Sequence, residues 1–198
     1  MLKDILSMIA SLMLLVGILI CIGMSVDACT QQEQDKVFSE TAMVCKVFNK
    51  TCTVHVVKYE GYGAQTRYGG DIYITNSLAD RLNEKQLRSV MYHEVGHVVL
   101  EHIEKTAQEL YNCKQSNSCN PEQVSAIHRK YEYQADRFSV LTTLLTGKGE
   151  GLSEALTIIT PPDQFNKTQA THPSTADRIK AINKITGGFY GRQTVPNN

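Results

Sequence analysis

The chain has 198 residues, of which 42% are hydrophobic, so it can bury one sizeable core but has no room for a second large domain. Its 20 basic and 20 acidic side chains balance, and this balance argues against broad electrostatic binding of nucleic acid. We therefore expect one globular domain and no nucleic-acid partner.

The N-terminus departs from this average composition. Residues 5–24 form an almost continuous apolar run, interrupted only by Ser, Gly and Cys. Roughly 20 such residues can span a membrane, so the run is either a retained anchor or a long signal sequence. Lys3 before the run and Asp27 after it favour a cytoplasmic N-terminus and an exported remainder. The expected division is a signal peptide or anchor over 1–28 and a globular domain over 29–198 with a polar C-terminal tail.

The end of the apolar run leaves its processing open. Val26-Asp27-Ala28 carries small residues at alternating positions, which leader peptidases prefer, and Cys29 follows directly. Cys29 is therefore a candidate for lipidation, although Val26 and Asp27 make a poor lipoprotein box. Cleavage or lipidation near Cys29 and a retained anchor both remain open.

The first elements of the globular part are a helix and a small sheet. Residues 31–40 are polar and form either a linker or the solvated start of a helix that continues to about Phe48. Residues 52–60 are rich in β-branched side chains and favour a strand. After glycine-rich turns, residues 64–68 and 71–75 favour a hairpin or two further strands. We expect a small antiparallel sheet.

The period of the apolar residues then becomes helical. Asn83 and Gln86 predict a capping box, and an apolar stripe continues from there to about Glu104. Asn120 followed by Pro121 predicts the start of a long helix, because this pair supplies a cap and a first-turn proline.

Two shorter helices complete the expected elements. One covers residues 153–160, and the last opens at Ser174 and ends at the glycine pair 187–188. The whole pattern indicates an α+β fold that is mainly helical, with a small antiparallel sheet and one apolar N-terminal helix in front of it.

Four cysteines beyond the apolar run form two closely spaced pairs. Cys45 lies near Cys52 and Cys113 lies near Cys119, which leaves Cys29 over. Four cysteines allow three pairings, and the local pairing closes two short loops without any long-range geometry. We expect this local pairing, which suits an exported protein. A second metal site is the alternative, but the spacings are wider than C-x-x-C and no histidine pair accompanies them.

The segment His93-Glu94-Val95-Gly96-His97 carries an H-E-x-x-H motif within an expected helix. Two imidazoles four residues apart lie on one helical face, where both can bind one Zn²⁺. The glutamate between them can hold a water molecule against the metal. On its own, the motif also occurs in unrelated proteins whose histidines are only solvated or cap a helix.

A catalytic zinc site usually has three protein ligands, so the motif needs one more. One class of H-E-x-x-H enzymes continues with G-x-x-H, but Leu100 and Ile103 occupy those positions here, which excludes that class. The other class takes a glutamate from a later helix. The next long helix offers Glu132, followed one turn later by Asp136. Without this spacing, Glu132 would equally well be a surface ion-pair partner.

Three further segments carry a resemblance to a known family. Residues 132–136 read E-Y-Q-A-D and resemble the E-x-x-A-D element of zinc endopeptidases related to HtpX, the CAAX prenyl endopeptidases and the periplasmic proteases BepA and LoiP. His172-Pro173 followed by Arg178-Ile179 is similar to their C-terminal H-P…R-I element, and His102 repeats a histidine of bacterial members. The resemblance covers residues 54–185.

This resemblance implies a zincin-like metalloprotease domain with one Zn²⁺ per chain. It implies the metal ligands His93, His97 and Glu132, with Glu94 as the general base that takes a proton from a zinc-activated water. It also implies that Asp136 holds a ligating histidine in place, because a ligating imidazole usually donates its other N–H to a carboxylate.

Four further polar residues are assigned from the sequence. His172 either packs locally or enters the site as a transition-state donor or a fourth, inhibitory zinc ligand, and Arg178 is its expected companion. We carry both as catalytic candidates. His102 is expected to be a helix-face or capping residue rather than a ligand. His128 is expected to be solvated or hydrogen-bonded.

An extended substrate is expected to add as a strand to the edge of the sheet. The glycines before the third strand leave room for a close approach. The candidate residues for this edge are Asp71, Ile72, Tyr73 and Ile74.

The resemblance favours a zinc endopeptidase of the bacterial cell envelope, acting on protein or peptide substrates and serving in the quality control of envelope proteins. It would be exported to the periplasm, or attached to the membrane facing the periplasm through the N-terminal segment or a lipid on Cys29. One alternative is a non-enzymatic, zinc-bound binding or chaperone-like protein whose zinc is closed off by His172. A third is a membrane-anchored structural protein whose motif is accidental.

Overall fold

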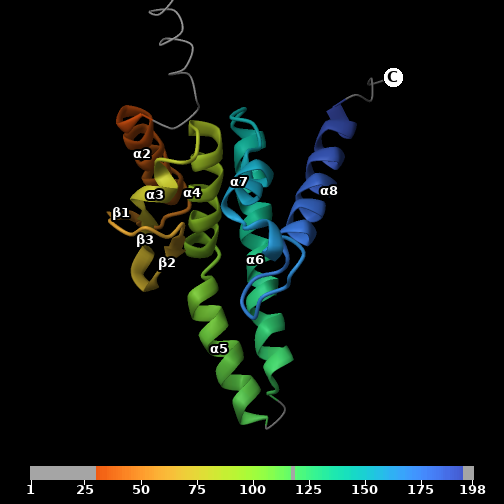
Figure 1. The fold of residues 1–198 in the computed structure, drawn as a ribbon. Helices are drawn as coiled ribbons and strands as arrows, with labels where there is room; N and C mark the ends of the chain where they lie inside the picture. Colours follow the sequence, from red (N-terminus) through yellow and green to blue (C-terminus); the bar gives the residue numbers. More distant parts are fainter. Residues whose placement is uncertain (1–29, 117–118, 194–198) are drawn as a thin grey trace, which may run out of the picture.

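The computed structural model describes residues 30–116 and 119–193 (Figure 1). The apolar run 5–24, its processing site and Cys29 lie outside the described residues. Within the described part of the chain, no helix has the length and apolar character needed to cross a membrane.

The chain enters the fold through the helix α2 (Gln31–Val47), so the helical alternative for this segment is confirmed. Thr30 caps α2, because its hydroxyl accepts a hydrogen bond from the Glu33 N–H while the Glu33 carboxylate accepts one from the Thr30 N–H. Val37 and Cys45 are buried, and α2 packs against α4 (Glu84–Val99). A disulfide between Cys45 and Cys52 ties the end of α2 to the start of the sheet.

The sheet contains β1 (Thr53–Val57), β2 (Ala64–Thr66) and β3 (Asp71–Thr75) in the order β1-β3-β2. β2 and β3 are antiparallel, as a hairpin requires, but β1 and β3 are parallel. The sheet is therefore mixed, and the expectation of a wholly antiparallel sheet was wrong for β1. The chain reverses direction twice between β1 and β3, so the two strands run the same way.

The strand β3 is central, which corrects the expectation that Asp71, Ile72, Tyr73 and Ile74 form a substrate-binding edge. Both sides of β3 are paired with strands, and Ile72 and Ile74 are fully buried. Gly70, at φ +88°, has another reason to be glycine: an added Cβ would lie 2.1 Å from the carbonyl oxygen of Thr51. The glycine thus admits a close approach of the chain's own loop.

After the sheet come α3 (Asn76–Ala79), α4 and α5 (His102–Gln115). The predicted capping box of Asn83 and Gln86 is present at the start of α4. The helix ends at Val99 rather than near Glu104, because Glu101 adopts a left-handed backbone conformation with φ 59°. The helix α5 then starts in a new direction.

The remaining helices are α6 (Pro121–Leu145), α7 (Leu152–Ile159) and α8 (Thr175–Gln193). The predicted cap and first-turn proline start α6, and Ser174 caps α8 by accepting from the Asp177 N–H. The expected end of α8 at the glycine pair 187–188 was wrong. A glycine ends a helix by taking a positive φ, and neither of these glycines does.

The helices α4 and α6 run side by side through the middle of the molecule (Figure 1). The sheet and α2 lie on one side of this pair, and α7 and α8 lie on the other. The expected mainly helical α+β fold is confirmed. Residues from all these layers meet in one buried core, which includes Val37, Ile72, Ile74, Leu87, Met91, Val95, Val140, Leu152 and Ile182.

The helix α5 and the first half of α6 project from this body as a helical hairpin (Figure 1). A disulfide joins Cys113 of α5 to Cys119, which lies just before α6, at the far end of the hairpin. The structure therefore contains both of the expected local disulfides. The near ends of the hairpin, by contrast, lie where α4 and α6 meet.

Candidate metal centre

The close contact of α4 and α6 gathers three potential metal ligands. His93 and His97 come from α4 and Glu132 comes from α6, and their ligand atoms all lie within 4.8 Å of one another. The Nε2 atoms of the two histidines are 3.1 Å apart. The carboxylate oxygens of Glu132 lie 3.5 Å from each of these nitrogens. The structure thus brings the three expected ligands together in one place.

The donor set and its surroundings fit a Zn²⁺ ion. Two imidazole nitrogens and one carboxylate oxygen are common zinc ligands, and such a set leaves a coordination position open. Glu132 Oε2 is buried and has no hydrogen-bond partner among the described residues, and a cation would satisfy it. Three carboxyl groups, those of Glu94, Glu132 and Asp136, are buried here beside the guanidinium of Arg178. With the two imidazoles neutral, a divalent cation would balance these charges.

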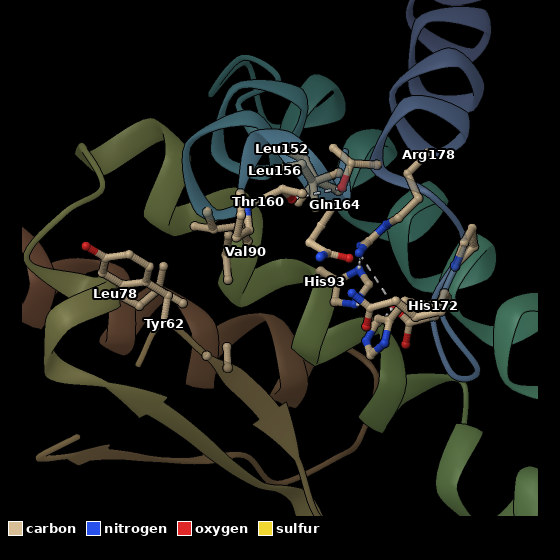
Figure 2. Close-up of a pocket in the computed structure, with 18 of the residues that line it drawn as sticks. Tyr62, Leu78, Val90, His93, Leu152, Leu156, Thr160, Gln164, His172 and Arg178 are labelled. Carbon is tan, nitrogen blue, oxygen red and sulfur yellow. Dashed lines mark hydrogen bonds and ion pairs between the residues drawn. The ribbon is translucent and has the colours of Figure 1, made fainter. Parts of the chain in front are cut away.

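Asp136 orients the first of the two histidines. Its Oδ1 accepts a hydrogen bond of 2.8 Å from His93 Nδ1, so His93 Nε2 is left to face Glu132. The guanidinium of Arg178, from α8, donates to both oxygens of Asp136, with 2.8 Å from Nε and 2.6 Å from Nη2. Arg178 therefore binds Asp136 directly, in addition to lying near His172 (Figure 2).

The electrostatics of this cluster favour bound positive charge. Burial opposes a charge on His93, but the hydrogen bond to Asp136 and the negative charges of Asp136 and Glu132 outweigh it and raise the His93 pKa to about 10. Burial alone would raise the pKa of the carboxyl groups of Glu132 and Asp136. The nearby positive charges of His93 and Arg178 outweigh burial and hold both pKa values below their usual range. The carboxylates thus stay ionised, and the cluster attracts a cation.

Glu94 lies beside the ligands and is held by the sheet. Its side chain is buried, and the hydroxyl of Thr66 on β2 lies 2.8 Å from Oε2 and 2.9 Å from the Glu94 carbonyl oxygen. Burial raises the pKa of Glu94, towards the range in which a carboxyl group both accepts and returns a proton. Nothing in the sequence pointed to Thr66, because its contact depends on how β2 packs against α4.

The second histidine has an outer partner that was not expected. His102 is 2% exposed, and its Nδ1 lies 3.1 Å from Nδ1 of His97. Its Nε2 lies 3.2 Å from the side-chain oxygen of Gln134. His102 is outside the ligand cluster, as expected, but it is buried against a ligand rather than lying on an outer helix face. His128 does not belong to this cluster.

His172 approaches the cluster from the loop that precedes α8. Its Nε2 lies 3.5 Å from Glu132 Oε2, and its Nδ1 lies 2.8 Å from the hydroxyl of Thr171. The side chain is about half exposed. Burial of the ring lowers its pKa, so the imidazole is neutral at pH 7. Figure 2 shows His172 next to His93 and Arg178.

A cavity of about 370 Å³ opens beside His93 and Glu94 (Figure 2). One end holds the polar groups of the cluster, with His172 and Arg178. The other end is apolar and lies between α4, α7 and the start of β2. Its apolar lining includes Tyr62, Leu78, Val90, Leu152, Leu156 and Ile159.

A second cavity of about 370 Å³ lies on the side of His97. Its lining includes the charged residues Lys50, Arg67, Glu101 and Glu104. The ligand cluster therefore has a hollow on each side.

Comparison with known proteins gives a family for this fold and site. The family model of Peptidase family M48 matches residues 28–120 and 116–186. No curated protein matches the chain significantly. The matched residues contain the H-E-x-x-H motif of α4 and both acidic residues of α6 that meet it. Because these segments take in most of the chain, the chain belongs to peptidase family M48, a family of metal-dependent peptidases.

Proposed function

We propose that this protein is a zinc endopeptidase with His93, His97 and Glu132 as its metal ligands. The observation that carries the proposal is the meeting of these three side chains in one largely buried cluster, with Glu94 beside them. Membership in a metallopeptidase family supports the reaction class. The choice of zinc follows from the donor set, since two imidazoles and one carboxylate suit Zn²⁺.

The residues around the cluster have separate roles in the proposed reaction. A zinc ion bound here would lower the pKa of a water molecule and polarise the carbonyl of the substrate. Glu94 accepts a proton from the attacking water and passes it to the leaving amine. The hydroxyl of Thr66 holds one oxygen of Glu94 in place, so the other oxygen remains for the water. Asp136 and Arg178 hold His93 in its ligating orientation.

The surroundings of the cluster support cleavage within a chain rather than at its end. The two cavities flank the ligands, one at His93 and one at His97, so a substrate has room on both sides of the cleaved bond. β2 is an edge strand that borders the first cavity and reaches Glu94 through Thr66. We therefore expect an extended peptide to pair with β2, in place of the central strand β3.

His172 stands 3.5 Å from Glu132, which supports a place in the reaction rather than a purely local packing role. Two such roles remain from the sequence, a donor to the transition state and a fourth ligand that shuts the site. Its half-exposed ring and its position on a loop are compatible with movement into and out of the cluster.

We further propose that the protein works in the bacterial cell envelope and belongs with the HtpX, CAAX prenyl endopeptidase and BepA–LoiP group. The apolar run 5–24 supports export or anchoring, with lipidation of Cys29 as the alternative attachment. The two disulfides support an oxidising compartment such as the periplasm. Misfolded or misassembled envelope proteins are the proposed substrates.

The variant Glu94→Gln tests the proposed reaction. In the full-length zinc-loaded protein, hydrolysis of a denatured, dye-labelled protein should fall by about 10²-fold or more, because the amide cannot take a proton from water. Bound zinc, measured by atomic absorption, should stay at one ion per chain. Glu60→Gln, which changes an exposed glutamate outside both cavities, is the matched control. Undiminished hydrolysis in Glu94→Gln would contradict the proposal, and zinc without hydrolysis in the native protein would favour a binding protein.

A further inference from the structure

The two histidines of the motif have different outer partners. Nδ1 of His93 lies 2.8 Å from the carboxylate oxygen Oδ1 of Asp136. Nδ1 of His97 lies 3.1 Å from Nδ1 of another imidazole, that of His102. The second nitrogen of His102 lies 3.2 Å from Oε1 of Gln134, so the contact continues to the next helix. The Nδ1 atom of each potential ligand thus has a hydrogen-bond partner, which is a carboxylate for His93 and an imidazole for His97.

These contacts determine which atom carries each hydrogen. Oε1 of Gln134 can only accept, so His102 must donate from Nε2. A neutral imidazole has a single N–H, which leaves Nδ1 of His102 as an acceptor. The hydrogen between the two rings therefore belongs to Nδ1 of His97. Nε2 of His97 is then left with a lone pair, and this atom faces Glu132.

The backbone bends to bring His102 into this place. In a continuous α-helix, a residue five positions after His97 would be turned about 140° away from it. The helix α4 instead ends at Val99, and Glu101 adopts a left-handed conformation with φ 59°. Non-glycine residues rarely adopt such a conformation, because the Cβ approaches the following carbonyl oxygen. An ion pair of 2.6 Å from Lys50 to Glu101 supports the bend.

Packing fixes the ring of His102 in addition to its hydrogen bonds. The ring is 2% exposed and lies 4.7 Å, centroid to centroid, from the ring of Tyr131. In α5, His102 is the buried residue, and it lies at the start of the helix. The base of the helical hairpin is therefore built around the contact with His97.

We propose that His102 and Gln134 are positioning residues that hold His97 in the tautomer whose Nε2 can bind the metal. The proposal rests on the proposed role of His97 as a zinc ligand. A histidine without a fixed outer hydrogen bond rotates and exchanges between tautomers, and both changes weaken metal binding. Neither His102 nor Gln134 belongs to the group of potential ligands or lines the two cavities beside it, so both would act through His97.

Four variants separate the hydrogen bonds from the bulk of the side chains. His102→Leu and Gln134→Met remove the acceptors but keep most of the volume. His102→Asn places an amide oxygen near the former Nδ1, and Gln134→Glu keeps an acceptor at the same chain length. His128→Leu removes a histidine of α6 outside the cluster and is the matched control.

Zinc affinity of the full-length protein, measured by chelator competition, is the first readout. His102→Leu should lose about 10- to 100-fold in zinc affinity. Gln134→Met should lose less, because Gln134 contacts His97 only through the ring of His102. His102→Asn, Gln134→Glu and His128→Leu should remain close to the native affinity. Native affinity in both His102→Leu and Gln134→Met would overturn the proposal. Gln134 is exposed, so Gln134→Met keeps the test open even where His102→Leu does not fold.

Nitrogen-15 NMR of the histidine rings is the second readout. In the zinc-loaded native protein, His97 should carry its hydrogen on Nδ1, and that hydrogen should exchange slowly with solvent. In His102→Leu the exchange should become fast, whereas His102→Asn should restore slow exchange. A native His97 protonated at Nε2 would overturn the proposal. Both readouts are independent of peptide hydrolysis. A zinc-loaded protein without peptidase activity would contradict the proposed function, whereas zinc affinity and the NMR of His97 would still decide the role of His102 and Gln134.

Discussion

At the scale of single residues, Asp136 sets the orientation of the His93 ring. It is 1% exposed, and it joins His93 of α4, a potential metal ligand, to the guanidinium of Arg178 on α8. The fork of Arg178 fits both carboxylate oxygens at once, which fixes the carboxylate plane and with it the ring of His93. Removing one partner of a buried ion pair leaves the other partner uncompensated.

The variant Arg178→Met should therefore destabilise the protein by about 3–5 kcal/mol, because Asp136 would keep a buried charge without its cation. Urea unfolding of the zinc-free protein measures this change without a contribution from the metal. Arg178→Met combined with Asp136→Asn should recover part of the loss, since the charge is then gone. A single variant as stable as the native protein would show that the fork only orients Asp136 and does not stabilise the fold.

At the scale of elements, the site depends on how closely α4 approaches α6. Gly96 lies inside the motif, and a Cβ built on it would be 3.1 Å from the Cα of Ala135 and 3.1 Å from the Cβ of Phe138. Both distances are shorter than ordinary contacts between carbon atoms. The missing side chain therefore lets the two helices meet at the level where His93 and His97 face Glu132.

The variant Gly96→Ala should separate the two helices by a few tenths of an ångström and so weaken zinc binding and hydrolysis together. In an open helix the same change would stabilise by about 0.5–1 kcal/mol, because alanine loses less backbone entropy than glycine. Gly187→Ala in α8 is the matched control, since nothing lies within 4 Å of its added Cβ. It should raise the unfolding free energy and leave zinc affinity unchanged. Native zinc affinity in Gly96→Ala would show that the helices tolerate the added methyl group.

Elements whose signals are local could be predicted from the sequence. The caps at Asn83, Asn120 and Ser174 start their helices where expected, because a cap depends on residues three positions apart. The strand over 71–75 was also predicted, but its central place in the sheet was not. Alternating side chains do not tell which strands lie beside a strand, and that choice is made by distant packing.

The candidate site shows the same division. His93 and His97 could be named because their spacing of four residues reflects the helical period, whereas Glu132 was named through the resemblance of residues 132–136 to the family's E-x-x-A-D element. The contact of His102 with His97 could not, since it needs the left-handed turn at Glu101, a residue type that gives no local signal for such a turn. Thr66 was missed for a related reason, because its contact with Glu94 joins a strand to a helix.

At the scale of the whole molecule, the site lies in a cleft between two differently built walls. The chain at the start of β2 and the helix α3 form one wall, and α7 with the loop before α8 forms the other (Figure 2). Near His93 the cavity is polar, but its far end is lined by apolar side chains, among them Val90, Leu152 and Leu156. Val90 precedes His93 by three residues on the same face of α4, so the apolar end directly adjoins the ligands.

A substrate side chain next to the cleaved bond should therefore be apolar. Complete burial of a leucine side chain is worth about 1.5–3 kcal/mol, and the half-open cavity should give the lower part of this range. In peptides that differ at one position beside the cleaved bond, leucine should raise kcat/KM by about tenfold over aspartate, which would lose its hydration.

Liquid chromatography of the products with mass spectrometry gives both the rates and the position of the bond. Tyr62→Ala should reduce the preference because it removes part of the apolar lining, and Tyr59→Ala is the control outside this cavity. Equal rates for the leucine and aspartate peptides would show that the substrate passes the cleft without entering its apolar end.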